Sequence, residues 1–179
     1  MSVSCRQKGL VLSVDDYVPA VYSAFYNRKE QGIVADYVIV MGYDEHFAGG
    51  DAGSVASISY VENGITGTLK EVPKEKLINS VPFYTRVWTE KDGKTTSKAY
   101  GMTAAKNVDE NNVELTWQDK VGQYYGEIEN ENGVQKIWME EASPGTEKDL
   151  VNQYDLAGIA CWKLGFETAD IWTIMDEVK

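Results

Sequence analysis

The sequence around residue 43 combines several side chains that can exchange protons or form hydrogen bonds. An apolar run, "VIVM" at 38–41, is followed by a glycine, Tyr43, Asp44, Glu45 and the only histidine of the chain, His46. A phenol can donate a hydrogen bond where negative charge develops, and a carboxylate can bind hydroxyls or transfer a proton. A single histidine, with no second histidine or cysteine nearby, argues against a metal site. These residues are the first candidates for a functional site.

Three further apolar segments also end in polar or aromatic side chains. In parallel α/β proteins, ligand sites gather at the carboxyl ends of the strands, because successive strands deliver their last side chains to one rim. We therefore expect these side chains to lie near Tyr43. They are Asp15 and Asp16 after the segment 10–14, Tyr84 and Arg86 in the segment 75–88, and Trp162 at the end of the segment 157–162.

The elements that must position these residues alternate between strands and helices. Four strands are predicted, beginning near residues 10, 37, 77 and 157, and their apolar residues run on without polar alternation. Such strands, separated by helices, indicate a parallel sheet buried on both faces, so the fold class is α/β. Helices are predicted at 26–35, with Asn27 as N-cap, around Ile58, and at 169–179.

The stretch between the third and fourth predicted strands is about twice as long as a βα unit requires. It contains a short predicted helix at 102–108 and two strands, 123–129 and 134–140, joined by the turn "NENG". We therefore expect a small α+β insertion here. The predicted division is an α/β part at 1–87 and 140–179, and the insertion at 88–139.

Composition and charge narrow the classes of partner. The 179 residues are 43% hydrophobic and 25% charged, which is a globular composition, and the net charge is −11. This charge argues against nucleic acid and against an anionic membrane surface, both of which attract basic proteins. No stretch approaches the roughly 18 apolar residues of a membrane span, and the first apolar run is too short for a signal peptide. An uncharged polymer or small molecule fits better.

The order of these motifs resembles a known family. "MGYD" follows one buried strand, "VPFYTRVW" the next, and "LAGIACW" comes after the insertion. This order resembles the C-terminal half of a family 18 glycoside hydrolase, the chitinase-like group, and in particular its bacterial spore-cortex and cell-wall members. The resemblance covers essentially the whole chain. It implies strands five to eight of a TIM (β/α)8 barrel, with the insertion between strands seven and eight.

The resemblance also implies roles for individual residues. Tyr43 would steady the acetamido group of the substrate, and Asp44 would bind sugar hydroxyls near the cleaved bond; both are the candidate catalytic residues. Tyr84 and Arg86 would bind substrate, and Trp162 would form the floor of a sugar subsite. Glu45 departs from the family pattern and is a candidate subsite determinant.

Each of these residues also has an ordinary structural interpretation. Tyr43, Tyr84 and Trp162 are alternatively core side chains, and Asp44 is alternatively a solvated acid at a strand end. Arg86 would then form an ion pair, and His46 would be a plain loop residue. Asp15, Asp16 and Tyr17 are expected to line the groove at most.

Members of the family hydrolyse bonds next to N-acetylglucosamine with help from the substrate's own acetamido oxygen, while a protein acid protonates the leaving group. The family's acid motif, DxxDxDxE, is not matched in the sequence. We therefore expect the C-terminal portion of a hydrolase of chitin or peptidoglycan, without its general acid and without a cofactor. The parent protein would be extracellular or in the cell envelope.

Two alternatives to the hydrolase portion stay open. One is a non-catalytic, chitinase-like module that binds N-acetylglucosamine oligosaccharides. The other is an inactive half-barrel that self-associates, because unpaired sheet edges recruit further strands.

Overall fold

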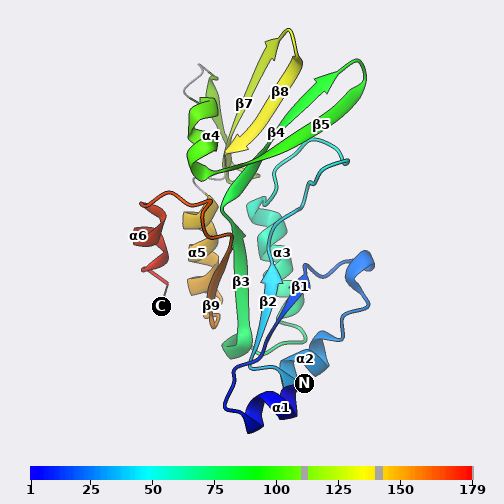
Figure 1. The fold of residues 1–179 in the computed structure, drawn as a ribbon, viewed down its shortest axis with the longest axis vertical. Coiled ribbons are helices and arrows are strands. Elements are labelled where there is room, and N and C mark those ends of the chain that lie inside the picture. Colours follow the sequence, from blue (N-terminus) through cyan, green and yellow to red (C-terminus); the bar gives the residue numbers. More distant parts are fainter. Residues whose placement is uncertain (110–112, 140–142, 179) are drawn as a thin grey trace.

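The computed structural model describes residues 1–109, 113–139 and 143–178, without the side chains of 107–109 and 143–145. The described part contains a four-stranded and a five-stranded sheet (Figure 1). The four-stranded sheet lies in the lower half of Figure 1, and the five-stranded sheet extends above it. The α/β fold class predicted from the sequence is confirmed by the first of these sheets.

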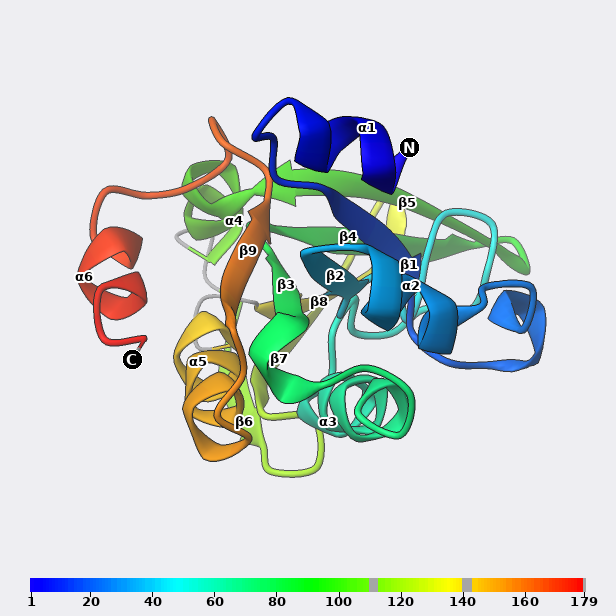
Figure 2. The ribbon, with the colours of Figure 1, turned by 90° about the horizontal axis from the view of Figure 1, so that it is seen from below.

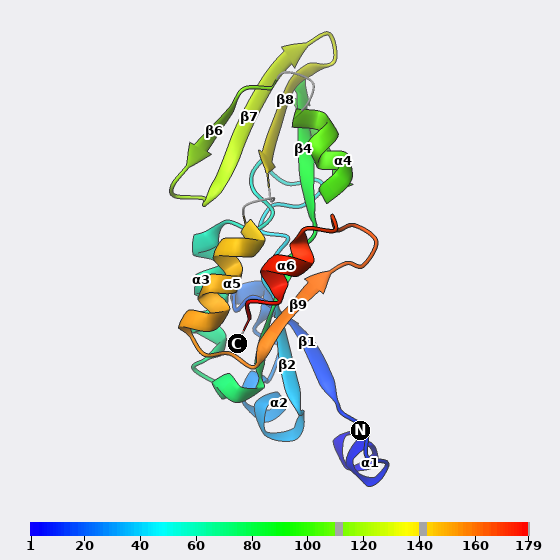
Figure 3. The same ribbon diagram turned by 90° about the vertical axis from the view of Figure 1, so that its left-hand side faces the viewer.

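The four-stranded sheet is parallel throughout, in the order β1-β2-β3-β9. Figure 2 shows these strands side by side, and Figure 3 shows α3 and α5 together on one side of them. The strands are β1 (Ser13–Tyr17), β2 (Tyr37–Met41), β3 (Leu77–Pro82) and β9 (Gly158–Trp162), and the helices that connect or cover them are α2 (Arg28–Val34), α3 (Ile58–Thr68) and α5 (Ser143–Gln153).

Burial alternates along β2, because successive side chains of a strand point to opposite faces. Val38 and Val40 are fully buried and belong to the main core, whereas Ile39 and Met41 are only half-buried. Along β2 the sheet therefore has a well-covered face against the helices and a more open face, so the prediction that the sheet is buried on both faces is wrong for this strand.

Local capping explains where two helices begin. The side chain of Asn27 accepts a hydrogen bond from the backbone N–H of Glu30 at the start of α2, as predicted. Ser57 does the same for Tyr60 at the start of α3. Gly64 allows α3 to approach the chain after β1, because a Cβ there would lie 2.9 Å from Val18 Cγ2.

The segment 75–88 was predicted as one strand, and this prediction is wrong. β3 ends at Pro82, and a separate strand, β4 (Tyr84–Lys91), begins after Phe83 and pairs in the second sheet. The backbone N–H of Phe83 donates to the carbonyl of Trp162, and the Phe83 ring is fully buried. The chain therefore changes sheets at Phe83, and Tyr84 stands on the antiparallel sheet.

The five-stranded sheet is antiparallel, in the order β5-β4-β8-β7-β6, and lies between β3 and β9 in the chain. The two strands predicted from the sequence are present as β7 and β8, although residue 140 lies outside the described residues; β5 and β6 were not predicted. The elements are β4, β5 (Lys94–Gly101), α4 (Met102–Asp109), β6 (Leu115–Gln118), β7 (Gln123–Asn130) and β8 (Gly133–Met139).

This sheet begins at Tyr84, so the expected domain boundary at residue 88 falls within β4. The other expected boundary, at residue 140, lies outside the described residues. Met139 and Ile137 of β8 pack with Val87 of β4 and Ala105 of α4 in a small core of their own.

The ends of the chain differ in detail from the expected elements. A short helix, α1 (Ser2–Gln7), precedes β1, which begins three residues later than residue 10. The last helix, α6 (Ile171–Met175), is shorter than the predicted 169–179. Two single turns of 3-10 helix lie at Val21–Ser23 and Lys74–Lys76.

Candidate active site

The carboxyl ends of three parallel strands surround a cavity of about 220 Å³. Tyr17 ends β1, and Trp162 ends β9. Met41 ends β2, and Tyr43 and Asp44 follow it after one glycine. The cavity thus brings together Tyr43, Asp44 and Trp162, three residues expected from the sequence to share one rim. Tyr17, expected at most to line the groove, also lines this cavity, whereas Met41 was not among the predicted residues.

Tyr43 is held so that its hydroxyl can act as a donor. Its side chain is only 8% exposed, and its ring meets that of Tyr84 edge to face, with 6.2 Å between centroids. Burial raises the pKa of Tyr43 above its ordinary value, and a hydrogen bond with Ser80 opposes this shift. Because the phenol keeps its proton at neutral pH, it can donate a hydrogen bond to a ligand.

The carboxylate of Asp44 is fixed by a second tyrosine. The Tyr84 hydroxyl donates to Asp44 Oδ1 at 2.5 Å, and Tyr84 is 6% exposed. Burial, followed by this hydrogen bond, raises the pKa of Tyr84, so the donor stays protonated. The backbone of Asp44 has φ of +60°, a conformation that aspartate tolerates better than most residues. Both features give Asp44 a defined orientation.

Trp162 presents its indole at the open side of the cavity. Its side chain is 54% exposed, so it is not a buried core residue. Its neighbour in the adjacent strand is Pro82, the last residue of β3. An exposed indole face of this kind is suited to contact with a flat, apolar ligand surface.

Arg86 and Glu45, two other predicted site residues, do not line this cavity. Arg86 lies two residues beyond Tyr84 on β4 and donates through Nη1 to Ser97 Oγ at 3.2 Å. Glu45 turns toward α3, where its Oε2 accepts a hydrogen bond from the backbone N–H of Ser57 at 2.9 Å. A carboxylate in this position favours the start of the helix.

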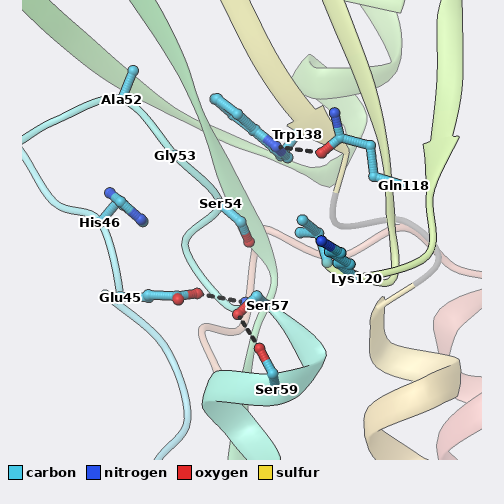
Figure 4. A pocket seen from close by; sticks show the side chains of 11 residues that line it. Glu45, His46, Ala52, Gly53, Ser54, Ser57, Ser59, Gln118, Lys120 and Trp138 are labelled. Carbon is cyan, nitrogen blue, oxygen red and sulfur yellow. Dashed lines mark hydrogen bonds between the residues drawn. The ribbon is translucent and has the colours of Figure 1, made fainter.

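A second pocket, of about 380 Å³, lies between the loop after β2 and the turn before β7 (Figure 4). Glu45 and His46 line it on one side, and Lys120 lines it on the other. Trp138 lines it as well and donates through Nε1 to Gln118 at 3.2 Å. Sequence reasoning missed this pocket because its two sides come from segments far apart in the chain, one at 45–59 and the other at 118–138.

Asp15 and Asp16 lie in different surroundings, because adjacent side chains of a strand point to opposite faces of the sheet. Asp16 is fully buried, accepts a hydrogen bond from Gln31 Nε2 at 2.9 Å, and has Arg28 Nε at 3.7 Å. Burial raises the pKa of Asp16 despite the opposing effects of Gln31 and Arg28. Asp15 is exposed. Neither residue lines the cavity around Tyr43.

Comparison with known proteins identifies the family. The sequence model of glycosyl hydrolases family 18 matches residues 5–167. The chain belongs to glycosyl hydrolases family 18. The resemblance inferred from the motif order is thereby confirmed.

Two curated proteins that resemble the chain come from Bacillus subtilis (strain 168). "Uncharacterized glycosylase YvbX" is 28% identical over 149 residues, which cover 82% of this chain and 43% of that protein. "Cortical fragment-lytic enzyme" is 26% identical over 157 residues, covering 85% of this chain and 36% of that protein. The chain thus spans about two fifths of the length of these relatives.

Solved structures with the same fold include two of bacterial origin. A chitinase from Chromobacterium violaceum ATCC 12472 superimposes with a TM-score of 0.90 at 22% identity, covering 98% of this chain and 57% of that one. The Bacillus megaterium QM B1551 spore cortex-lytic enzyme SleL superimposes with a TM-score of 0.86 at 23% identity, and the match covers 99% of this chain and 43% of that one. Nearly the whole length of this chain thus shares its fold with these two structures.

Among the described residues, no group of three or more histidine, cysteine or acidic side chains is arranged to hold a metal ion. In the same part of the chain, no helix has the length and apolar character needed to cross a membrane.

Proposed function

We propose that this chain forms the substrate-holding part of a glycoside hydrolase that acts on a polysaccharide containing N-acetylglucosamine, either chitin or peptidoglycan. In this proposal β1, β2, β3 and β9 correspond to strands five to eight of a (β/α)8 barrel. The parallel order of the four strands supports the assignment, as does the position of the second sheet between β3 and β9 in the chain.

The cavity shared by Tyr43, Asp44 and Trp162 carries the proposal. It combines a protonated phenol, an oriented carboxylate and an exposed indole within about 220 Å³. The indole can stack on the C–H face of a pyranose ring, the carboxylate can accept from ring hydroxyls, and the phenol can donate to an acetamido oxygen. A single amino-sugar ring therefore offers a partner to each of the three side chains.

The proposed chemistry is substrate-assisted hydrolysis with retention of configuration. The acetamido oxygen of the bound sugar attacks the anomeric carbon, and the glycosidic C–O bond breaks as the leaving oxygen takes a proton from a carboxylic acid. Tyr43 would hold the acetamido group in line for this attack, which lowers the barrier by restricting its motion. The chain contains no DxxDxDxE motif to supply the acid. Alone, it should bind the glycan without cleaving it.

Three further residues have proposed roles around the cavity. Tyr84 acts through Asp44 as a positioning residue. Arg86 is two residues away on the same face of β4, where it would bind sugar hydroxyls beyond Asp44. Glu45 lines the neighbouring pocket together with Ser57, and its carboxylate accepts a hydrogen bond from the backbone N–H of Ser57 just before α3. Through this pocket, Glu45 would influence the sugar subsite.

We also propose that the parent protein acts at the cell envelope or outside the cell. The names of two related proteins, a cortical fragment-lytic enzyme and a spore cortex-lytic enzyme, support this setting.

Calorimetric titration with the N-acetylglucosamine trimer tests the proposal. We expect the wild type to bind and Trp162→Ala to lose about tenfold or more in affinity, the equivalent of roughly 1.4 kcal/mol. Trp117→Ala is the matched control, because Trp117 is a similarly exposed tryptophan (43%) on β6, outside the cavity. Absence of binding, or equal binding by Trp162→Ala, would refute the proposal.

A turnover assay tests the missing acid separately. With a chromogenic chitooligosaccharide, the chain should release no product above background. Turnover comparable with that of an intact chitinase would show that the acid is present after all.

A further inference from the structure

The end of β1 and the segment that follows it carry four exposed or partly exposed aromatic side chains, here called the aromatic platform: Tyr17, Tyr22, Phe25 and Tyr26. Tyr22 is 62% exposed and Phe25 is 73% exposed. Tyr17 lies 6.3 Å from Tyr22 and 6.2 Å from Tyr26, centroid to centroid, and Phe25 lies 4.3 Å from Tyr26. The rings thus form one continuous surface.

Two buried polar side chains hold the platform in shape. Ser23 Oγ donates to the carbonyl of Val18 at 2.8 Å, and the same oxygen accepts from the backbone N–H of Ala20 at 2.9 Å. Arg28, only 3% exposed, donates to the carbonyl of Tyr17 at 2.8 Å and to Ser23 Oγ at 3.1 Å. The loop is therefore fixed from beneath while its rings face outward.

Arg28 also supports one of the rings directly. Its guanidinium carbon lies 5.3 Å from the centroid of Tyr26, within the range of a cation–π contact. Exposed aromatic rings that are held rigidly lose little conformational entropy when a ligand covers them. This arrangement is suited to binding.

The platform is continuous with the cavity of the candidate active site. Tyr17 belongs to both, because it lines the cavity together with Tyr43 and contacts Tyr22 and Tyr26. Tyr60 provides a second link: its hydroxyl donates to the carbonyl of Tyr43 at 3.5 Å, and burial, followed by the nearby Tyr22 side chain, raises the pKa of Tyr60. A ligand that protrudes from the cavity past Tyr17 therefore meets the platform.

We propose that the aromatic platform binds further sugar rings of the same glycan that enters the cavity, an inference that rests on the proposed function. The cavity, at about 220 Å³, is smaller than the roughly 300–1,000 Å³ of pockets that enclose a drug-sized ligand, so the rest of an oligosaccharide must lie outside it. Tyrosine and phenylalanine rings offer flat faces for the C–H faces of pyranoses, and the tyrosine hydroxyls can bond to sugar hydroxyls.

The length dependence of binding tests this inference. Calorimetry compares the N-acetylglucosamine dimer with the pentamer on the wild type, on Tyr22→Ala/Phe25→Ala and on Tyr22→Phe/Phe25→Tyr. The last variant keeps both rings and is the matched control. We expect the wild type to bind the pentamer about tenfold tighter than the dimer. The double alanine variant should lose that advantage and keep its affinity for the dimer, whereas the control should keep most of it. Thermal unfolding checks that all three proteins are folded.

Other outcomes separate the possible failures. If the wild type binds neither oligomer, the proposed function fails, and this inference fails with it. If the double alanine variant keeps the pentamer advantage, or loses dimer and pentamer affinity equally, the platform is not a subsite although the cavity binds sugar. If sedimentation shows a wild-type dimer that this variant abolishes, with the length dependence unchanged, the platform is a contact between copies and the inference is overturned.

Discussion

Replacement of Tyr84 by phenylalanine removes one hydroxyl from beneath the candidate active site and should have a measurable cost. The hydroxyl donates to Asp44 Oδ1 at 2.5 Å, and the tyrosine is 6% exposed, so water cannot easily take its place. A hydrogen bond to a charged group contributes about 1.5–3 kcal/mol. At about 2–4 °C per kcal/mol for a chain of this size, the midpoint of thermal unfolding should fall by about 3–12 °C.

Tyr125→Phe is the matched control for this prediction. The Tyr125 hydroxyl also donates to a carboxylate, that of Glu127, but this pair lies at the surface. Surface substitutions of this kind usually change the free energy of unfolding by no more than about 0.5 kcal/mol. If Tyr84→Phe costs no more than Tyr125→Phe, Tyr84 does not hold Asp44, and its role as a positioning residue is refuted.

The same variant has a predicted pH dependence. The pKa of Tyr84 is raised in the folded chain, so above the ordinary value of 10.0 the folded state keeps a proton that the unfolded state releases. The stability of the wild type then falls as pH rises above that value, whereas phenylalanine has no proton to release. The difference in stability between wild type and Tyr84→Phe should therefore shrink above about pH 10. A difference that grows would contradict this sign.

Two further substitutions test the surroundings of the site. Burial raises the pKa of Asp16, so its contribution to stability falls as pH rises above the ordinary value of 3.8. Urea titrations should show Asp16→Asn gaining stability relative to the wild type between about pH 4 and pH 7, and a relative loss would contradict burial as the dominant cause. Gly42→Ala would place a Cβ 2.8 Å from Asn79 Oδ1 and should cost about 1–3 kcal/mol. Gly50→Ala, where the nearest atom is 3.4 Å away, should change little; equal effects would show that the space around Gly42 is not tight.

The parts of the fold that could be predicted have strong local signals. The four parallel strands are marked by apolar runs, and α2 is marked by Asn27, whose side chain caps it. The change of sheet at Phe83 has no such signal, because the apolar run continues through residue 83 into β4. β5 was not predicted because its polar sequence, "KTTSKAYG", resembles a loop. It forms an edge strand only by pairing with β4.

The candidate site was predictable to the extent that topology determines it. Tyr43, Asp44 and Trp162 meet because parallel strands deliver their carboxyl ends to one rim. Glu45 turns away because a distant backbone N–H, that of Ser57, binds its carboxylate. Such a contact depends on the loop 46–56, whose path the sequence does not reveal. The closely spaced aromatic residues in "YVPAVYSAFY" could have indicated the platform, but the sequence alone does not show that their rings are exposed.

A crystal of the chain soaked with the N-acetylglucosamine trimer tests most directly whether one amino-sugar ring occupies the cavity. The account predicts a ring stacked on the indole of Trp162, with its acetamido oxygen within hydrogen-bond distance of the Tyr43 hydroxyl and a ring hydroxyl near Asp44. Density for the sugar only in the pocket lined by His46 and Lys120, or no density with the cavity accessible to solvent, would contradict it.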